Sequence, residues 1–316
     1  MSGRVVTLGE TMGLLRAESI GSLAHLGSLA IGVGGSESNV AIALRRLGVD
    51  AVWVGRVGDD GLGVRVAREL RAEGVEAHAI VDESAPTGLM LKELPAAGRT
   101  AVRYYRGGSA GSRLGPADLP PDLIEGADLL HVTGITPLLS ASCLAAVHAA
   151  IDRARERGAT VSFDVNHRAA LGAAESAAPV LRELADRADL LFGGEEELRL
   201  VGGAGADAAE LAESLAGDGR TVIAKLGAAG AVAVAEGRTV AAEGFAVPVV
   251  DTVGAGDAFV AGYLSAHLAG LPLEQRLRRG NACGALLCTA PGDWEASPTL
   301  RDIDRLLRGG GDPVER

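Results

Sequence analysis

The 316-residue sequence contains no Gly-Lys dipeptide, so the phosphate-binding pattern GxxxxGK[ST] is absent. That pattern uses its lysine to reach the phosphates of a nucleotide, and its absence excludes the P-loop class of proteins. The signature segments of protein kinases are missing as well. Any phosphate site in this chain must therefore be built in another way.

Long apolar runs and basic runs are also absent. No segment approaches the ~18 uninterrupted apolar residues of a membrane-spanning helix, and the start MSGRVVTLGE is too poor in apolar residues for a signal peptide. These absences predict a soluble cytoplasmic protein. The net charge of −11 argues against a nucleic-acid or membrane partner, because no basic run compensates it. An anionic substrate would therefore need locally placed arginines.

The chain has three cysteines, Cys143, Cys283 and Cys288, and their spacing matches no metal site. An odd number of cysteines without such spacing is typical of a reducing compartment. We expect all three to pack in the core, because a free cysteine behaves as a small hydrophobic residue.

Hydrophobic residues make up 47% of the chain and no long polar low-complexity segment occurs, so a globular fold is expected. Short apolar runs alternate with helix-like segments such as NVAIALRRLG and GVRVARELRAEG. These runs are VVTLG at Val5, AVWVG at Ala51, DLLHV at Asp128, TVSFDV at Thr160, DLLF at Asp189 and TVIAKL at Thr221. The alternation predicts a mainly parallel sheet with helices on both faces.

Two stretches do not follow this alternation. They are LLRAESI with its continuation to Ile31, and TGLMLKEL followed by RTAVRYYR. We expect extra strands here, forming a small sheet over the strand ends. Ligands of open α/β sheets bind outside the carboxyl ends of the strands, so this sheet is placed to act as a lid.

Two glycine-rich turns compete as phosphate sites. The GxGxxA pattern at residues 203–208 follows the helix-like EEELRLV, whereas dinucleotide binding requires a preceding strand. The stretch DTVGAGDAF, residues 251–259, follows the apolar run FAVPVV, predicted as a strand, and precedes AFVAGYLSAHLAG, predicted as a helix. Because the N–H groups at a helix start can hold an anion, the second turn is the better candidate.

Asp257 lies inside this second turn. Phosphoryl transfer needs stabilisation of negative charge and a group that accepts the proton of the attacking hydroxyl. The N–H groups of Ala255, Gly256 and Asp257 would hold phosphoryl oxygens, and the Asp257 carboxylate would be the general base. A cap on the following helix is the alternative role for Asp257, and the turn alone does not decide between the two.

DTVGAGDAF resembles the carboxyl-terminal signature of the ribokinase-like, or PfkB, carbohydrate kinases. GGSESNVAIALRRLGVDAVWVGRVGDDGLG, residues 34–63, resembles their amino-terminal signature, and the resemblance extends to PGDWEASP near Pro291. It implies that Asp257 is catalytic, together with Gly254, Ala255 and Gly256. It also implies ATP and Mg²⁺ as cofactors and a sugar-like alcohol as the acceptor.

The same resemblance implies a single ribokinase-like (Rossmann-like) α/β domain over residues 1–316. Its lid strands would come from about residues 12–33 and 86–107. In many members of this family the lids pair, so the resemblance implies a homodimer or a higher homo-oligomer.

Three further segments, VRYYRGGSAGSRLGP, LLHVTGITPLLS and FDVNHR, resemble the 2-keto-3-deoxygluconate kinases within this family. The resemblance implies transfer of the γ-phosphoryl group to the 6-hydroxyl of that sugar acid. The implied sugar contacts are Gly35, Ser36, Glu37, Ser38, Asn39, Tyr104, Tyr105, Arg106, Arg168 and Asp293.

The two arginines have a chemical reason to be in such a site. A keto-acid sugar carries a carboxylate, which arginine binds through two parallel hydrogen bonds, whereas a neutral hexose needs no such partner. Tyr104 and Tyr105 are adjacent on a predicted strand, so their side chains should point to opposite faces, and one of them should only pack.

On the nucleotide side, KLGAAG resembles the family's loop beside ATP, which implicates Lys225, Gly227 and Gly230 with the turn at Gly254, Ala255 and Gly256. Asn166 and Arg168 are expected to reach the phosphates. An exposed lysine at a strand end is an equal alternative for Lys225.

The sequence departs from the family pattern at three places. Gly194 replaces the asparagine of a segment linked to Mg²⁺, although Glu197 is still expected to order a metal-bound water. Met90 stands where related kinases carry a sugar-contacting tyrosine, which leaves fructose or another ketose or pentose as the alternative substrate. Pro291 precedes Gly292-Asp293, where relatives often carry a basic or small residue. The need for a monovalent cation stays open.

A sugar- or nucleotide-binding protein that has lost the chemistry is the alternative from another functional class. Such a protein would be free to lose its base. Asp257 within an intact GAGD sequence therefore favours the enzyme.

Overall fold

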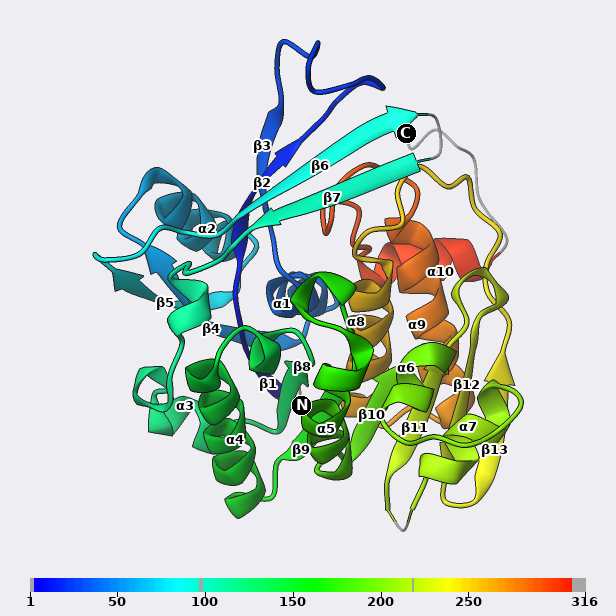
Figure 1. The fold of residues 1–316 in the computed structure, drawn as a ribbon. Helices are drawn as coiled ribbons and strands as arrows, with labels where there is room; N and C mark the ends of the chain where they lie inside the picture. The colour runs from blue at the N-terminus through cyan, green and yellow to red at the C-terminus, as the bar shows by residue number, and fades with distance from the viewer. Residues whose placement is uncertain (1–2, 97–98, 218, 309–316) are drawn as a thin grey trace.

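The computed structural model describes residues 3–96, 99–217 and 219–308. Nine of its strands form one sheet, in the order β13-β12-β11-β10-β9-β8-β1-β4-β5 (Figure 1). Six of these strands are the apolar runs predicted from the sequence: β1 (Arg4–Leu8), β4 (Asp50–Gly58), β8 (Leu129–Thr133), β9 (Thr160–Asp164), β10 (Leu190–Gly193) and β11 (Thr221–Lys225). They pair in parallel. The predicted mainly parallel sheet is confirmed.

Three strands of this sheet were not predicted: β5 (Glu76–Asp82), β12 (Ala231–Ala235) and β13 (Arg238–Ala242). β5 pairs in parallel with β4, whereas β12 and β13 pair antiparallel and form one edge. The predicted strand FAVPVV is wrong, because the chain has left this edge and is irregular over residues 243–249. Pro248 lacks the N–H that a strand would donate, and Val249 is 64% exposed.

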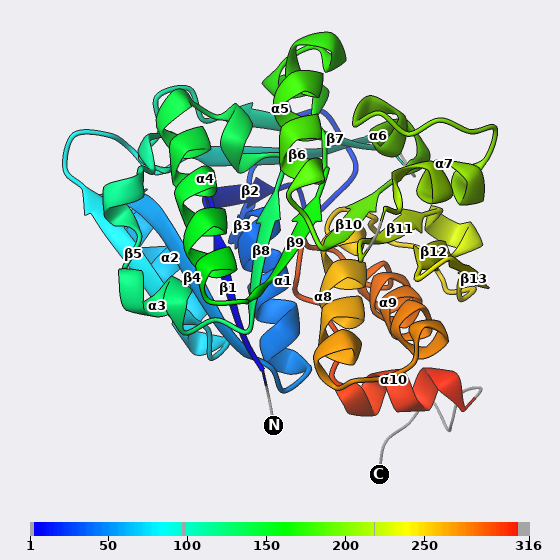
Figure 2. The ribbon, with the colours of Figure 1, turned by 90° about the horizontal axis from the view of Figure 1, so that it is seen from below.

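Helices cover both faces of the large sheet. One face packs against α4 (Ala141–Glu156), α5 (Ala174–Asp186), α6 (Glu195–Leu200) and α7 (Ala208–Leu215), with the short α3 (Pro121–Glu125) beside them. The opposite face packs against α1 (Ser36–Arg46), α2 (Gly61–Ala72), α8 (Ala255–Leu268) and α9 (Leu273–Leu287), and α10 (Leu300–Leu307) packs against α9. Figure 2 shows α4 and α5 on one side of the sheet and α1, α8 and α9 on the other.

Alternation along the strands creates these two cores. On β1, Val6 and Leu8 point into one core, and Val5 points into the other. Successive residues of a strand face opposite sides, so strands buried on both faces are apolar throughout. Cys143 and Cys283 are buried as expected, whereas Cys288 is only half-buried.

A second sheet has the order β3-β2-β6-β7 and lies across the top of the view in Figure 1. Its strands are β2 (Met12–Arg16), β3 (Ala30–Gly34), β6 (Leu89–Ala96) and β7 (Arg99–Tyr105), which lie in the two stretches outside the alternation. β2 pairs antiparallel with β3 and parallel with β6, so this sheet is mixed.

The strand order places β1 at the point where the chain changes direction across the large sheet. From β1 the chain goes to β4 and β5 on one side, and later returns to β8 on the other side of β1. Ligands in open α/β sheets bind at such a point, beyond the carboxyl ends of the strands. In the described parts of the chain, no helix has the length and apolar character needed to cross a membrane.

Candidate active site

The GAGD turn, residues 254–257, forms the start of α8. Gly254 precedes the helix with φ 84°, and a Cβ on this residue would lie 1.9 Å from the Asp293 carbonyl oxygen. Only glycine accepts both this backbone conformation and this approach. The Ala255 N–H donates to the Thr252 carbonyl at 3.2 Å, so the free helix-start donors to seek here belong to Gly256 and Asp257.

Asp257 is buried between α8 and α1. Its Oδ1 accepts from Ser36 Oγ at 2.7 Å and its Oδ2 accepts from Asn39 Nδ2 at 2.8 Å. The cap position of α8 is Gly254, and no side chain caps this helix. The carboxylate therefore points toward α1 and does not serve as the helix cap.

Burial raises the pKa of Asp257, against the opposing effects of the Ser36 and Asn39 hydrogen bonds and the Arg168 and Lys225 charges. A raised pKa makes the carboxylate a stronger proton acceptor than an exposed aspartate. Ser36 and Asn39, expected near the site from the sequence, thus contact the proposed base directly.

A narrow cavity lies beside Asp257, under the second sheet. It is lined by both the expected sugar contacts and residues that were not expected: Glu10, Met12, Gly35, Ser36, Glu37, Asn39, Met90, Tyr104, Arg106, Ile135, Arg168, Val253, Gly254, Asp257 and Asp293. Ser38 does not line this cavity, and its hydroxyl donates to the Gly35 carbonyl at 2.9 Å. Tyr105 points away from the cavity and is 60% exposed, since neighbouring strand residues face opposite sides.

Arg106 does not stand alone in this cavity. Its Nε donates to Glu10 Oε2 at 2.7 Å, its Nη2 lies 2.6 Å from the same oxygen, and its guanidinium lies 5.5 Å from the centre of the Tyr104 ring. Ser109 also donates to Glu10. Glu10, at the end of β1, was not predicted as a site residue. Its charge compensates Arg106, so a bound carboxylate would meet less positive charge than the sequence suggests.

Glu37 is a buried residue of the cavity wall. Its Oε1 accepts from Thr133 Oγ1 at 2.7 Å and from Thr136 Oγ1 at 2.6 Å. Its Oε2 has no partner among the described residues. Burial raises the pKa of Glu37. A buried polar atom without a partner is costly, so Oε2 is suited to accept a hydroxyl of a bound sugar.

Lys225 lies on the other side of the GAGD turn, at the end of β11. Its Nζ lies 2.6 Å and 2.7 Å from the two carboxylate oxygens of Asp164, at the end of β9. Burial opposes the charge of Lys225, but Asp164 and Glu197 raise its pKa, so the ammonium is retained. A Cβ on Gly256 would lie 3.7 Å from this ammonium, so the charge stands next to the turn. An exposed strand-end lysine is therefore excluded.

A second cavity of about 600 Å³ adjoins Lys225 and the turn. Its size suits a nucleotide-sized ligand. The expected residues Lys225, Gly227, Gly230, Ala255 and Gly256 all line it, together with apolar groups from residues 244–249 and from α9. Asn166 and Arg168 do not line it. Asn166 Nδ2 donates to Ser36 Oγ at 2.7 Å, beside Asp257, and Arg168 faces the first cavity.

Glu197, expected to order a metal-bound water, has both carboxylate oxygens engaged. Oε1 accepts the His167 N–H at 2.9 Å and Oε2 accepts the Gly194 N–H at 2.8 Å. Over residues 3–96, 99–217 and 219–308, no three His, Cys, Asp or Glu side chains gather as a metal site. Mg²⁺ in phosphoryl-transfer enzymes is held largely by substrate phosphates and water, so a protein cage is not required.

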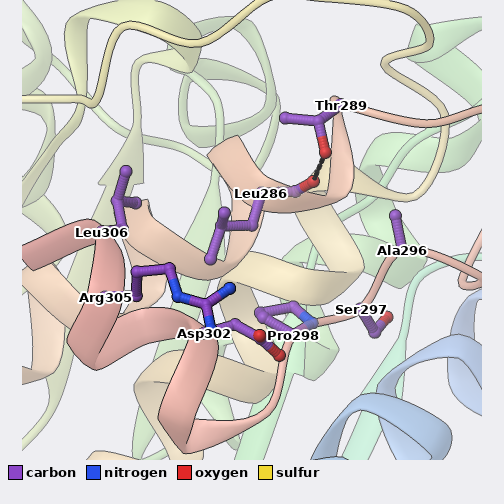
Figure 3. A pocket seen from close by; sticks show the side chains of 8 residues that line it. All are labelled: Leu286, Thr289, Ala296, Ser297, Pro298, Asp302, Arg305 and Leu306. Atoms are coloured by element: carbon purple, nitrogen blue, oxygen red, sulfur yellow. Dashed lines mark hydrogen bonds between the residues drawn. The ribbon is translucent and has the colours of Figure 1, made fainter. Parts of the chain in front are cut away.

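Another hollow lies between the end of α9 and α10 (Figure 3). Leu286 and Thr289 stand on one side of it, and Asp302 and Arg305 of α10 stand on the other. The residues expected in the site do not line this hollow, so it is separate from the two cavities at the GAGD turn.

The large sheet, the second sheet and the two cavities that both reach the GAGD turn define an α/β phosphotransferase of the ribokinase type. Residues 2–300 match the family described as pfkB family carbohydrate kinase. The chain belongs to this family, and kinases of this family use ATP. The fold class expected from the sequence is confirmed.

Curated relatives include sugar-acid and sugar kinases. The chain is 39% identical to 2-dehydro-3-deoxygluconokinase of Bacillus subtilis (strain 168), over 96% of this chain and 94% of the relative. It is 37% identical to 2-dehydro-3-deoxygalactonokinase of Haloferax volcanii over the full length of both chains. It is 35% identical to Fructokinase-2 of Solanum lycopersicum, over 98% of this chain and 97% of the relative.

Solved structures agree with the fold. The crystal structure of 2-dehydro-3-deoxygluconokinase from Thermotoga maritima has a TM-score of 0.90 at 28% identity, and covers 98% of this chain and 99% of that one. A putative Ribokinase II from E. coli, solved in complex with ATP and Mg²⁺, has a TM-score of 0.89 at 24% identity, over 98% of this chain and 99% of that one.

Proposed function

We propose that the protein transfers the γ-phosphoryl group of ATP to the 6-hydroxyl of 2-keto-3-deoxygluconate. The observation that carries this proposal is the first cavity, where Arg106 and Arg168 lie in the same wall as Asp257. A sugar acid bound there has cations for its carboxylate and a base for its hydroxyl. The relatives named for keto-deoxy sugar acids support the same substrate class.

In this mechanism Asp257 accepts the proton of the sugar hydroxyl as the hydroxyl oxygen forms its bond to the γ-phosphorus. The bond between that phosphorus and the β,γ-bridging oxygen breaks, and ADP leaves. The N–H groups of Gly256 and Asp257 and the Lys225 ammonium stabilise the negative charge on the phosphoryl oxygens. Ser36 and Asn39 hold the Asp257 carboxylate in place.

Mg²⁺ would neutralise charge on the phosphates of ATP. Among the described residues, we propose that Glu197 contacts Mg²⁺ through a water molecule. The contact is indirect because backbone N–H groups already bind both of its carboxylate oxygens.

Fructose is the second candidate, and two observations favour it. Glu10 compensates the charge of Arg106, and Met90 in the cavity wall offers no hydroxyl to a sugar acid. An assay of ADP release over a panel of keto-deoxy sugar acids, ketoses and pentoses tests the proposal. We expect the highest kcat/KM with 2-keto-3-deoxygluconate. Equal or higher kcat/KM with fructose would replace it by the second candidate.

Three finer points belong to the same proposal. We expect a monovalent cation to support turnover, tested by exchanging K⁺ for a bulky organic cation. We expect a cytoplasmic location, tested by cell fractionation. We expect a homodimer or higher oligomer formed through the second sheet, where Ile31 and Tyr105 are 51% and 60% exposed, tested by light scattering of wild type and Tyr105→Glu.

A further inference from the structure

Lysine is very rare in this chain. Of the 30 lysine and arginine residues only Lys92 and Lys225 are lysines, and all the others are arginines. Both lysines are largely buried and form ion pairs with aspartates around the GAGD turn. An ammonium is a compact point charge, whereas a guanidinium is wide and planar. Lysine is thus used at two places where a compact charge faces buried carboxylates.

Lys92 belongs to β6 of the second sheet, yet its charge lies among residues of the carboxyl-terminal part of the chain. Its Nζ lies 2.5 Å from Asp251 Oδ2 and 2.9 Å from Asp293 Oδ1. The three side chains are 1%, 6% and 3% exposed, respectively. Two buried carboxylates that lost this one cation would be left uncompensated, which is strongly unfavourable.

The two aspartates belong to two segments that contact the GAGD turn: residues 251–253, which lead into it, and the segment around Asp293, which packs against it. Asp251 accepts the Val253 N–H at 3.2 Å and the Gly292 N–H at 3.3 Å, so it ties residues 251–253 to the segment that contains Asp293. Asp293 lines the first cavity, and its carbonyl oxygen is the atom packed against Gly254. A shift of either aspartate would therefore move both the cavity wall and the turn.

We propose that Lys92 is a positioning residue for phosphoryl transfer. Its ammonium fixes Asp293 in the wall of the first cavity and, through Asp251, fixes the GAGD turn, so the second sheet must be seated for both to be in place. Lys92 thus differs from Lys225, which stands at the second cavity and is held by Asp164. This proposal rests on the proposed function, because it concerns the same reaction.

The variant Lys92→Ala tests the proposal. We expect kcat/KM for 2-keto-3-deoxygluconate to fall about 10²-fold, the usual effect of a small displacement of reacting groups. KM for the sugar acid should rise and kcat should fall, while KM for ATP changes little. The matched control is Arg103→Ala on β7, which removes an exposed partner of Glu93 from the same sheet and should leave the kinetics unchanged.

Rescue by amines separates positioning from simple destabilisation. At constant K⁺, methylammonium should restore kcat/KM of Lys92→Ala and saturate, because the truncated side chain leaves room for the missing charge. It should not restore Lys92→Met, whose side chain fills that room, and it should not activate the wild type. A folded Lys92→Ala with wild-type kinetics, or an inactive one whose rate no amine restores, would overturn the proposal.

A measurement on the wild type keeps the proposal testable if Lys92→Ala does not fold. Protein labelled with [¹⁵N]lysine has two side-chain ammonium signals, and Lys225→Met assigns them by retaining that of Lys92 alone. Sugar acid should shift the Lys92 signal, because Asp293 lines the cavity. An unchanged Lys92 signal with saturating sugar acid would overturn the proposal. If the wild type does not phosphorylate the sugar acid, the proposed function fails, and both tests are repeated with the sugar that the panel selects.

Discussion

At the scale of single residues, Asp257 is the group on which the chemistry depends. Its carboxylate is buried and accepts from Ser36 and Asn39. Asp257 lines the first cavity, and Ala255 and Gly256 of the same turn line the second. Both hydrogen-bond donors belong to α1, so they fix the orientation of the carboxylate. Asp257 does not cap its own helix, because Gly254 occupies the cap position of α8.

Asp257→Asn keeps the size of the side chain and removes its ability to accept a proton. We expect a folded protein that binds ATP and whose kcat is at least ~10²-fold lower, the low end of the contribution of a positioned base. ADP release measures kcat, and isothermal titration measures ATP binding. Turnover near that of the wild type would exclude Asp257 as the base.

The raised pKa of Asp257 predicts how activity depends on pH. A carboxyl accepts a proton only when ionised, and burial makes Asp257 take up its proton at a pH above the ordinary value of 3.8. The kcat/KM for the sugar should therefore fall as the pH decreases, with a midpoint above 3.8. A profile that stays flat down to this value, in protein shown to be folded by circular dichroism, would contradict the assignment.

Arg106→Ala tests the carboxylate contact. A hydrogen bond to a charged group contributes roughly 1.5–3 kcal/mol, so we expect a loss of about one to two decades in kcat/KM for the sugar acid, carried by KM. KM for ATP should change little. Arg106→Lys should recover only part of the loss, because a point charge makes one contact where the guanidinium makes two.

Fructose phosphorylation by the same variant is the control for Arg106, because fructose has no carboxylate. An equal loss with fructose would mean that Arg106 acts by holding Glu10 in the cavity wall, and that the carboxylate contact is absent.

At the scale of elements, the GAGD turn depends on a glycine that no other residue replaces. Gly254→Ala combines a positive φ with a clash against Asp293. We expect the free energy of unfolding to fall by roughly 1–3 kcal/mol, the usual strain of such a residue, and kcat to fall with it. Urea unfolding and ADP release measure the two effects.

Gly270→Ala is the matched control at the other end of α8. Gly270 has φ 68°, and no atom lies within 4 Å of a Cβ built there. It should lose stability through backbone strain alone and keep its kcat. Equal kcat in the two variants would show that the shape of the GAGD turn does not matter for transfer.

The elements also show what local sequence patterns can predict. The six buried parallel strands were found because each is a short apolar run between helix-like segments. β12 and β13 were missed because an antiparallel edge hairpin has no helix between its strands. The apolar character of FAVPVV predicts a strand, but Phe245, Ala246, Val247 and Val249 line the second cavity and are not in the sheet.

At the scale of the whole molecule, the site residues also divide into those that local motifs predict and those that only distant contacts reveal. Asp257 and the α1 residues lie in continuous motifs, and the structure brings them together. Glu10, Lys92 and Asp164 were not predicted. Each forms its ion pair with a residue 96, 201 or 61 positions away in the sequence, respectively. A single charged residue at a strand end carries no local pattern, so tertiary contacts alone reveal its role.

The whole enzyme is proposed to prefer a sugar acid, and a competition in one tube tests this most directly. Wild-type protein receives ATP with equal, limiting amounts of 2-keto-3-deoxygluconate and fructose, and ³¹P NMR follows the two sugar phosphates, whose ratio reports the ratio of kcat/KM. We predict that the 6-phosphate of the keto acid forms faster from the start, and that most of the keto acid is consumed before fructose phosphate accumulates. Fructose phosphate forming first, or no transfer to the keto acid, would contradict the account.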